Sequence, residues 1–542
     1  MSAVLLAVFG LLGLSMTPDW SIRTNTSHVT VQPSSTSIAA RGLTTASEGT
    51  YAVATSRIRI KLSKTVTISA LLREPRNASG KRPACLFIEG AGTGSSSQVF
   101  GDIAHAMASA GIVTLVPDKR LDNYTLQHRD YQVMANDYMT SLDLLRNRVD
   151  IDASHTGIYA ESEGTWIASV MAHDHPDIGF MILTSPPVVS GRQQMAMAAT
   201  RYMQYIGAPE PMTRDISKVI SMDFSAVGLQ YADFPAQHYL PSFTMPLMVN
   251  FGTEDISMPI EQGANKLLAA AAKAGNRNVT LRYYPANHQI RVGSHTALPG
   301  LPLAPEYTRD LEHWVNAVAA GTTADGWSTP MIAGTQPHQK LATPERMSSG
   351  IVHSLTGLLA MIVAMAVALA GSIIGGLTLA VTAVIRGCRQ RWQERRAPRS
   401  AGSQAEGTLP ARHRSAGNDL AGIEASPHFN TSLAASLAMI MLFVAGSMGL
   451  LGWYLVTLGK AAVTLDVQTV LLYRWWKALR VVTLLGVVLL AWMLVALRGH
   501  RDSSGSRIPA VHGFGHVLEV GLIAASAVLS LSLLAFWGLF TL

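Results

Sequence analysis

Four long apolar stretches in the C-terminal part restrict the folds open to this 542-residue chain more than any other feature. They cover about residues 355–385, 432–458, 479–497 and 516–542. Each is long enough to cross a bilayer as a helix, which needs about 20 residues. Only 14% of all residues are charged, which is low for a water-soluble protein. We therefore expect residues 351–542 to form a membrane region with four transmembrane helices.

A basic loop between the first two stretches indicates the orientation of these helices. Its arginines are Arg386, Arg389, Arg391, Arg395, Arg396, Arg399, Arg412 and Arg414. A nucleic-acid-binding tail is the alternative, but basic loops beside spanning helices are typically retained in the cytoplasm. No basic module with interleaved aromatic residues is present, so nucleic acid is not an expected partner. The chain before residue 355 and the C-terminal Leu542 then lie outside the cytoplasm.

Three segments outside the main domains have simple compositions. Residues 1–20 begin with an apolar run of signal-peptide length, which predicts an export signal. The run is short for a spanning helix and lacks a basic start and a clear A-x-A site, so cleavage and retention both stay open. Residues 21–47 are rich in Ser and Thr and predict an extended lead-in. Residues 320–350 lack periodicity and predict a linker. The two cysteines, Cys85 and Cys388, fall on opposite sides of the membrane in this interpretation, which excludes a disulfide framework.

Residues 48–319 alternate between short apolar runs and helical patterns. The expected strands lie near residues 57–62, 66–72, 84–88, 111–116, 157–161, 179–184, 247–251 and 280–284. This alternation predicts an α/β domain with a mostly parallel, doubly wound sheet. Residues 187–240 interrupt it with a methionine-rich helical insertion, which suits a lid over an active site. Ordinary core methionine at helical spacing is the alternative.

The stretch 157–166 combines an apolar strand, a tight turn with Ser162, and a helix start. Ala160 and Gly164 stand two residues before and after this serine, which is the G-x-S-x-G spacing of a nucleophile elbow with alanine in the first position. Small residues are needed there because the chain turns so sharply that larger side chains would collide. The turn raises the Ser162 hydroxyl above the sheet and points the amide of Glu163 into the same space.

Three further candidates follow later strands, at the edge where open α/β sheets place their sites. Asp255 ends the strand near 247–251, and His288 follows the strand near 280–284. The order Ser, Asp, His is the one used by α/β hydrolases. The glycine-rich loop after residue 88 supplies backbone amides near Ala91 and Gly92. Glu254 and His295 are the alternative acid and base.

Residues 48–319 resemble the α/β-hydrolase superfamily, in particular the dienelactone hydrolase and acylaminoacyl-peptidase-like branch. The most specific parts are residues 160–168, 118–120, 252–259 and 284–288. The resemblance implies a serine hydrolase without metal or cofactor. It implies Ser162 as nucleophile, Asp255 as acid, His288 as base, and the amides of Ala91 and Glu163 as the oxyanion hole. Three residues depart from the family pattern: Glu89 replaces the usual histidine of the oxyanion loop, Leu121 replaces a common glycine, and Ala160 replaces the first glycine of the elbow.

Together these features predict a membrane-anchored, extracytoplasmic serine hydrolase that acts on carboxyl esters or related small acyl substrates. A peptidase or an acyltransferase of the same fold is the alternative among enzymes. A catalytically silent hydrolase fold that serves as a sensor for the membrane region is the alternative of another class. The four-helix region has no recognisable transporter motif, and Glu519 and His516 are expected at an interfacial position rather than within the membrane.

Overall fold

The computed structural model describes residues 1–16, 20–32, 35–296, 298–347, 351–352, 354–396, 429, 431–501 and 507–541. The chain falls into two compact units. The sheet unit comprises Thr17–Thr356 together with Gly459–Thr469. The helical unit comprises Met1–Met16, Gly357–Leu458 and Val470–Leu542.

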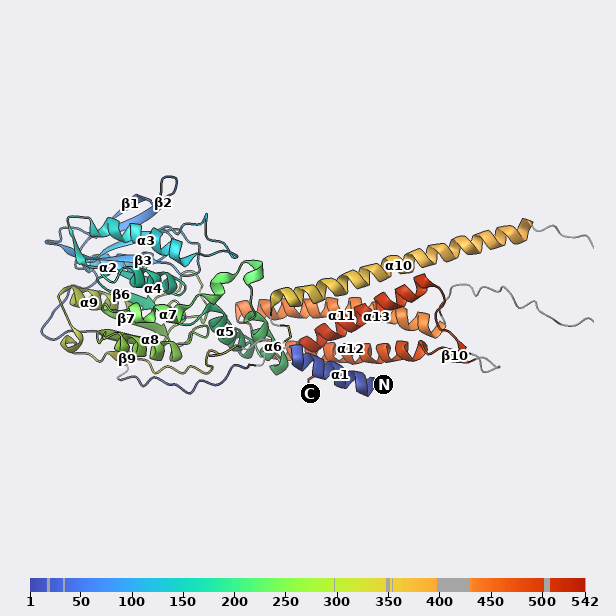
Figure 1. Ribbon diagram of the computed structural model, residues 1–542. Coiled ribbons are helices and arrows are strands. Elements are labelled where there is room, and N and C mark those ends of the chain that lie inside the picture. The colour runs from blue at the N-terminus through green and yellow to red at the C-terminus, as the bar shows by residue number, and fades with distance from the viewer. Residues whose placement is uncertain are drawn as a thin grey trace, which may run out of the picture. The chain divides into compact units, whose positions relative to one another are not determined.

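One twisted sheet of nine strands organises the sheet unit (Figure 1). Its strands are β1 (Val53–Lys61), β2 (Thr67–Pro75), β3 (Arg82–Ile88), β4 (Val113–Pro117), β5 (Ile151–Glu161), β6 (Met181–Thr184), β7 (Leu247–Gly252), β8 (Val279–Tyr284) and β9 (Ile332–Gly334). They lie in the order β1-β2-β4-β3-β5-β6-β7-β8-β9. β2 runs antiparallel to both its neighbours, and every other pair from β4 to β9 is parallel. The predicted α/β class with a mostly parallel sheet is confirmed.

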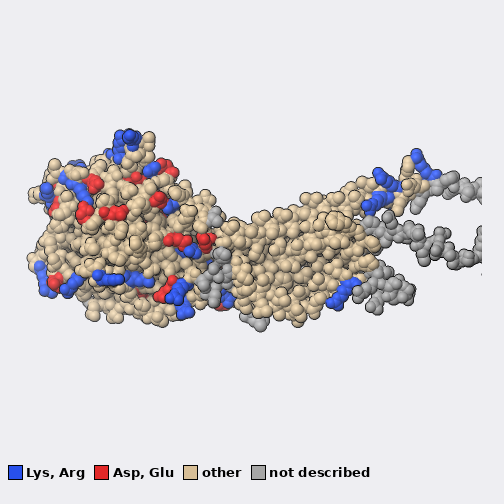
Figure 2. Space-filling model, viewed as in Figure 1, with Lys and Arg blue, Asp and Glu red and all other residues tan. Residues whose placement is uncertain are grey.

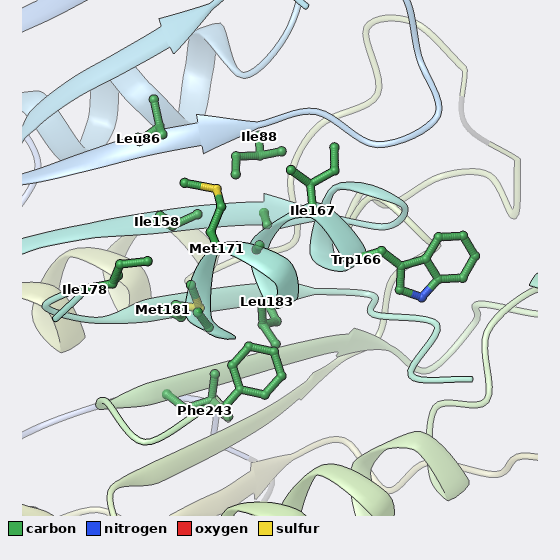
Figure 3. Close-up of a cluster of buried hydrophobic side chains, with 14 of the residues drawn as sticks. Leu86, Ile88, Ile158, Trp166, Ile167, Met171, Ile178, Met181, Leu183 and Phe243 are labelled. Carbon is green, nitrogen blue, oxygen red and sulfur yellow. The ribbon is translucent and has the colours of Figure 1, made fainter. Parts of the chain in front are cut away.

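Helices cover both faces of this sheet and create two hydrophobic layers. They are α2 (Gly101–Ser109), α3 (Tyr131–Arg146), α4 (Gly164–Asp174), α8 (Gln262–Lys273) and α9 (Tyr307–Ala319). Side chains of α3, α4 and α8 share one layer, and those of α2 and α9 share the other. Successive strand residues serve opposite layers, as Ile158 and Tyr159 do in β5. Figure 3 shows Ile167 and Met171 of α4 in the first of these layers. Their burial holds α4 against the strands of the sheet.

The expected insertion between β6 and β7 is helical. It holds α5 (Gly191–Tyr205), α6 (Glu210–Ile220), α7 (Ala236–Tyr239) and the 3-10 turns Ser225–Val227, Gln230–Asp233 and Leu240–Ser242. Met197, Met203, Met212 and Met222 are buried in it, whereas Met195 is exposed. The methionines therefore pack mainly as core residues, and a role of the insertion as a lid stays a prediction.

The segment expected to be a linker takes part in the sheet unit. Its residues 332–334 form β9 beside β8, preceded by a 3-10 turn at Ala324–Gly326. The buried carboxylate of Glu261 accepts hydrogen bonds from the amides of Gln339 (2.7 Å) and Val29 (3.0 Å). Glu261 thus ties the extended lead-in and the expected linker to the same point. A three-residue strand is too short to leave a periodic pattern, which is why the sequence did not predict it.

The helical unit contains the four predicted apolar helices. They are α10 (Leu355–Arg396), α11 (Thr431–Thr464), α12 (Thr469–Ala496) and α13 (Phe514–Phe536), each long and apolar enough to cross a membrane. The short strands β10 (His500–Arg501) and β11 (Arg507–Ile508) pair between α12 and α13. Figure 2 shows uncharged residues along the length of this unit and Lys and Arg toward helix ends. Of the basic loop, Arg399, Arg412 and Arg414 lie outside the described residues, as does Leu542.

Two close contacts involve glycines of the helical unit. The apolar N-terminal run forms α1 (Ser2–Met16) and packs on α13: a Cβ atom at Gly13 would lie 2.5 Å from the carbonyl oxygen of Ala535. In the same way, a Cβ atom at Gly375 of α10 would lie 2.2 Å from a carboxylate oxygen of Glu519. Glu519 is only 3% exposed. Small residues thus allow the helices to approach closely, as is common between membrane helices.

Candidate active site

Ser162 lies in the sharp turn between β5 and α4, as the sequence predicts. Its φ is 54°, in the left-handed region that non-glycine residues rarely adopt. Its amide donates to the carbonyl oxygen of Thr184 at the end of β6 (2.9 Å). A Cβ atom at Gly164 would lie 2.7 Å from the carbonyl oxygen of Ile88, so only glycine lets α4 begin this close to β3.

Backbone strain gathers around this turn. Ser185 and Val188 after β6 and Ile290 after β8 also have positive φ, of 48°, 62° and 55°. Strained conformations cost roughly 1–3 kcal/mol each and persist where the surrounding contacts hold them, often at functional sites. The carboxyl edge of the sheet therefore carries strain after three of its strands, β5, β6 and β8.

Asp255 and His288 meet at this edge. Asp255 Oδ2 lies 2.7 Å from His288 Nδ1, and the Asp255 side chain is fully buried. Its other oxygen accepts from the amide and hydroxyl of Ser257 (2.8 and 2.6 Å), which fixes the orientation of the carboxylate. Ser185 Oγ donates to the carbonyl oxygen of His288 (2.7 Å) and anchors the loop that carries the ring. No hydrogen bond between Ser162 Oγ and the His288 ring occurs in the described part of the chain; such contacts commonly tighten only with substrate.

The Asp255–His288 pair shifts both pKa values toward the charged forms. Burial acts to lower the pKa of His288, but the charge and hydrogen bond of Asp255 outweigh it and raise that pKa. Burial likewise acts to raise the pKa of Asp255, and the His288 ring and the Ser257 donors lower it overall. The ring is thereby held with Nδ1 as the hydrogen-bond donor, which leaves Nε2 free to accept a proton.

The alternative acid and base occupy a different environment. Glu254 and His295 approach each other at 3.5 Å, but their side chains are 42% and 45% exposed. Neither contacts the Asp255–His288 pair through a hydrogen bond in the described residues. Solvent screens such a pair, so it orients a ring far less firmly than the buried pair does.

The loop after β3 supplies the second expected oxyanion donor. Its residues Ala91, Gly92 and Thr93 are exposed, and a Cβ atom at Gly90 would lie 3.6 Å from Ser162 Oγ. The buried Lys119 donates from Nζ to the carbonyl oxygens of Gly90 and Gly92, the latter at 2.8 Å. These bonds turn the carbonyl groups of the loop toward Lys119, which fixes the conformation of the loop that carries the Ala91 amide.

Glu89 does not direct its charge at the expected oxyanion position. Its Oε1 accepts from the amide of Gly94 (3.1 Å), and its Oε2 lies 3.7 Å from Lys119 Nζ. Burial raises the pKa of Glu89, against the opposing charge of Lys119. Glu89, which replaces the usual histidine of this loop, therefore stabilises the loop, and Lys119 compensates its negative charge.

Glu163 anchors the helix side of the turn through its buried carboxylate. Arg129 Nη1 (2.6 Å), Tyr131 Oη (2.7 Å) and Tyr124 Oη (2.7 Å) all donate to it. Burial and the charge of Glu163 raise the pKa of both tyrosines, so both remain protonated donors. The Tyr124 ring also lies 4.4 Å from Lys119 Nζ and 4.7 Å from Arg129 Cζ. Tyr124 therefore connects Lys119, which holds the loop after β3, with Glu163, which holds the turn at Ser162.

Comparison with known proteins agrees with this geometry. Residues 100–299 match the profile of the prolyl oligopeptidase family, a range that includes Ser162, Asp255 and His288. No curated protein matches the chain. The strand order with only β2 reversed, the elbow at β5 and the order Ser, Asp, His are those of one fold.

The sheet unit has the α/β-hydrolase fold.

Solved structures similar to this chain include proteins described as hydrolases or peptidases. A protein described as a dienelactone hydrolase from Klebsiella pneumoniae subsp. pneumoniae has 15% identity and a TM-score of 0.31, over 44% of this chain and 88% of that one. A protein described as a dipeptidyl aminopeptidase IV from Bacteroides ovatus has 15% identity and a TM-score of 0.33, over 50% of this chain and 35% of that one. An α/β hydrolase from Penicillium has 14% identity and a TM-score of 0.30, over 40% and 86%.

Several residues of the candidate site escaped the sequence analysis. Tyr124, Arg129 and Tyr131 carry no motif, and Glu161 gave no hint of its burial beside His288. Burial raises the pKa of Glu161, while the charges of His288 and Arg291 oppose that rise. Lys119 was noted only as part of a family pattern. The one available signal was the pair Glu161 and Glu163, which flank Ser162 at the end of a buried strand. Because buried carboxylates require partners, this pair indicates that basic or hydroxyl groups lie nearby. Among the described residues, no cluster of three or more His, Cys, Asp or Glu could hold a metal ion.

Replacing Glu163 tests the anchor of the turn. In Glu163→Ala, Arg129 and two tyrosine hydroxyls lose a buried acceptor, and breaking such a pair costs about 3–5 kcal/mol. We expect the thermal midpoint of the full chain in detergent to fall by roughly 10 °C. Glu163→Gln keeps one acceptor oxygen and should lose less. The exposed Glu254→Ala is the control and should change the midpoint little; equal midpoints for Glu163→Ala and Glu254→Ala would contradict the anchor.

Proposed function

We propose that this chain is a membrane-anchored serine hydrolase that cleaves carboxyl esters of small acyl substrates. The observation that carries the proposal is the buried 2.7 Å contact of Asp255 with His288 at the same sheet edge as the strained turn of Ser162. Ester cleavage demands a nucleophile, a base, an orienting acid and oxyanion donors, and these residues can supply each of them. A peptide bond further requires that the flanking chain be held and a poor amine leaving group be protonated.

The proposed reaction begins when Ser162 Oγ attacks the acyl carbon and its proton passes to Nε2 of His288. Asp255 holds the ring through Nδ1 and stabilises the imidazolium, without itself taking the proton. The amides of Glu163 and Ala91 donate to the oxyanion of the tetrahedral intermediate, commonly the largest single contribution in such sites. The intermediate collapses as His288 protonates the leaving alcohol, and the acyl group stays on Ser162. Water, deprotonated by His288, then releases the acid and restores Ser162.

A peptidase that works through the same groups is the second candidate. The match to the prolyl oligopeptidase family profile favours it. A substrate panel separates the two: 4-nitrophenyl esters of short acids against proline-containing 4-nitroanilides. Faster turnover of the anilides would replace the ester assignment while leaving the proposed nucleophile unchanged.

The nucleophile is tested by Ser162→Ala. We expect labelling of the full chain by a fluorophosphonate probe and ester hydrolysis to be lost, by at least three powers of ten in rate. The variant should keep the thermal midpoint of the wild type, because Ser162 Oγ makes no hydrogen bond in the described residues. Activity within tenfold of wild type would end the serine-hydrolase proposal, and an unlabelled wild type would favour the silent sensor.

The acid is tested by comparing Asp255→Asn with Glu254→Gln over a range of pH. His288 must be neutral to act as base, and its pKa is raised by Asp255, so kcat/KM should fall as pH drops through that raised pKa. Asp255→Asn removes the raising charge while burial still lowers the pKa. The acid limb should therefore move to lower pH, and the plateau should fall about ten-thousandfold.

Glu254→Gln provides the matched control, because Glu254 is exposed and contacts His295 instead. We expect its plateau to stay within about threefold of wild type and its acid limb to stay in place. A larger loss in Glu254→Gln than in Asp255→Asn would transfer the role of acid to Glu254.

The proposed orientation places the hydrolase unit outside the cytoplasm. Arg386, Arg389 and Arg391 lie near the C-terminal end of α10, and basic residues at the end of a span are retained inside. Gly459–Thr469, between the second and third spans, belongs to the hydrolase unit, and Gln468 donates to the carbonyl oxygen of Ile206 (3.1 Å). This agrees with the count of spans, because two crossings return the chain to its starting side.

Cysteine labelling in intact cells tests this orientation. Cys388 is exposed near the end of α10, whereas Cys85 is buried. A membrane-impermeant maleimide should label Thr323→Cys, at an exposed position of the hydrolase unit, and should label Cys388 only after permeabilisation. Labelling of Cys388 but not of Thr323→Cys in intact cells would reverse the orientation.

A further inference from the structure

The four apolar stretches of the helical unit contain a single acidic residue, Glu519. It lies five residues after Phe514, the first residue of α13, and so about 8 Å along that helix. On α10 it meets Gly375, which lies eleven residues, or about 16 Å, before Arg386. On both helices the carboxyl group therefore lies within the apolar segment rather than at its end.

The carboxyl group of Glu519 is enclosed between α10 and α13. The residue is only 3% exposed. A Cβ atom at Gly375 would lie 2.2 Å from its Oε2, and a Cβ atom at Gly376 would lie 3.5 Å from its Oε1. Both carboxyl oxygens thus occupy space that two consecutive glycines leave open on α10. A side chain at position 375 would displace the carboxyl group from this contact.

The face of α13 that carries Glu519 points into the helical unit. Ser526 and Ser530 follow it by seven and eleven residues, spacings that return to one helix face, and both are fully buried. Ser530 Oγ lies 3.3 Å from Ser447 Oγ of α11. Leu518, next to Glu519 but on another face, is exposed. Glu519 therefore faces the neighbouring helices, whereas Leu518 lies on the side that lipid would contact.

No basic side chain neutralises Glu519 in the described part of the chain, where its carboxyl group forms neither a hydrogen bond nor an ion pair. The other titratable residue of α13 is His516, three residues earlier, whose ring packs on Phe429 with 4.6 Å between the ring centroids. The facing helices carry no charged residue at 355–385, 432–458 and 481–497. An ionised carboxylate without a partner is very costly in an apolar environment, so the group must bind a cation.

A proton fits this site better than a metal ion does. Metal ions in proteins are held by several oxygen, nitrogen or sulfur ligands. The described residues contain no group of three or more His, Cys, Asp or Glu that could hold one, and Glu519 is the one carboxylate of the apolar stretches. A carboxyl group that has bound a proton is neutral and can remain in an apolar contact.

We propose that Glu519 is a proton-binding site within the membrane region, closed by Gly375 and Gly376 of α10. The proton is bound as the O–H of the carboxyl group and leaves when the group ionises. Its loss puts an unpaired charge at the contact between α10 and α13. The helical unit thus has a chemistry of its own, independent of the reaction proposed at Ser162. This site departs from the interfacial position that the sequence predicts for Glu519.

Covalent labelling by dicyclohexylcarbodiimide, an apolar reagent that enters bilayers, tests for the protonated carboxyl group. The carboxyl group adds across one C=N bond: its oxygen bonds to the central carbon, and its proton passes to nitrogen. The adduct rearranges to a stable N-acylurea, which mass spectrometry detects on the peptide that contains Glu519. With the full chain in liposomes we expect Glu519 to be labelled. Labelling should fall as the pH is raised, because the ionised group lacks the proton that the addition needs.

Four controls accompany this experiment. Glu519→Gln should lose all labelling of this peptide. The exposed Glu254 should react with a water-soluble carbodiimide and not with the apolar one. Gly375→Ala should lose most of the labelling, because the added Cβ would displace the carboxyl group. Gly371→Ala lies one turn earlier on α10, where a Cβ atom would only contact Leu522 (3.4 Å), and it should keep the labelling. Gel filtration of each variant in detergent checks that it is folded.

Three results would overturn the proton site. The first is an unlabelled Glu519 in the wild type at every pH at which the chain stays folded. The second is equal labelling of Glu519 by the apolar and the water-soluble reagent, which would place the group at the interface. The third is protection by sodium chloride, compared with choline chloride at constant pH, which would assign the site to a sodium ion. None of these results bears on Ser162, so the proposed function is tested separately.

Discussion

The buried carboxylate of Glu163 is the contact on which the site depends most. Ser162 sits at a positive φ that costs free energy, and the chain keeps this turn only because its surroundings fix it. Arg129, Tyr131 and Tyr124 hold the residue immediately after the serine, all within 2.7 Å. The same Tyr124 ring contacts Lys119, whose ammonium group fixes the loop after β3. One connected set of contacts thus sets both amides proposed to receive the oxyanion.

The parts of the fold and site that the sequence predicted are those with short-range patterns. A continuous apolar run identifies β3 or β7, and the spacing of Ala160, Ser162 and Gly164 identifies the turn. The positions of Asp255 and His288 followed from strand ends. The partners of Glu163 could not be predicted in this way, because they lie more than 30 residues earlier in the chain and are held by packing rather than spacing. β9 was missed for the opposite reason, since three residues are too few to form a pattern.

The segment that leads from α9 to the first span belongs largely to the sheet unit. Residues beyond β8 do not simply lead away: β9 adds to the sheet, and Glu261 binds the amide of Gln339 as well as that of Val29. Most of the segment before the first span is therefore part of the sheet unit. The chain passes between the two units at four places, because Gly459–Thr469 also belongs to the sheet unit.

The charge balance around Ser162 matters for the proposed reaction, because the turn has the sequence Glu-Ser-Glu and an oxyanion is proposed to form beside it. Glu89, Glu161 and Glu163 would each repel that charge if they were uncompensated. Lys119 lies 3.7 Å from Glu89, Arg129 binds Glu163, and the charges of His288 and Arg291 act on Glu161. Each of these three carboxylates thus interacts with a positively charged side chain.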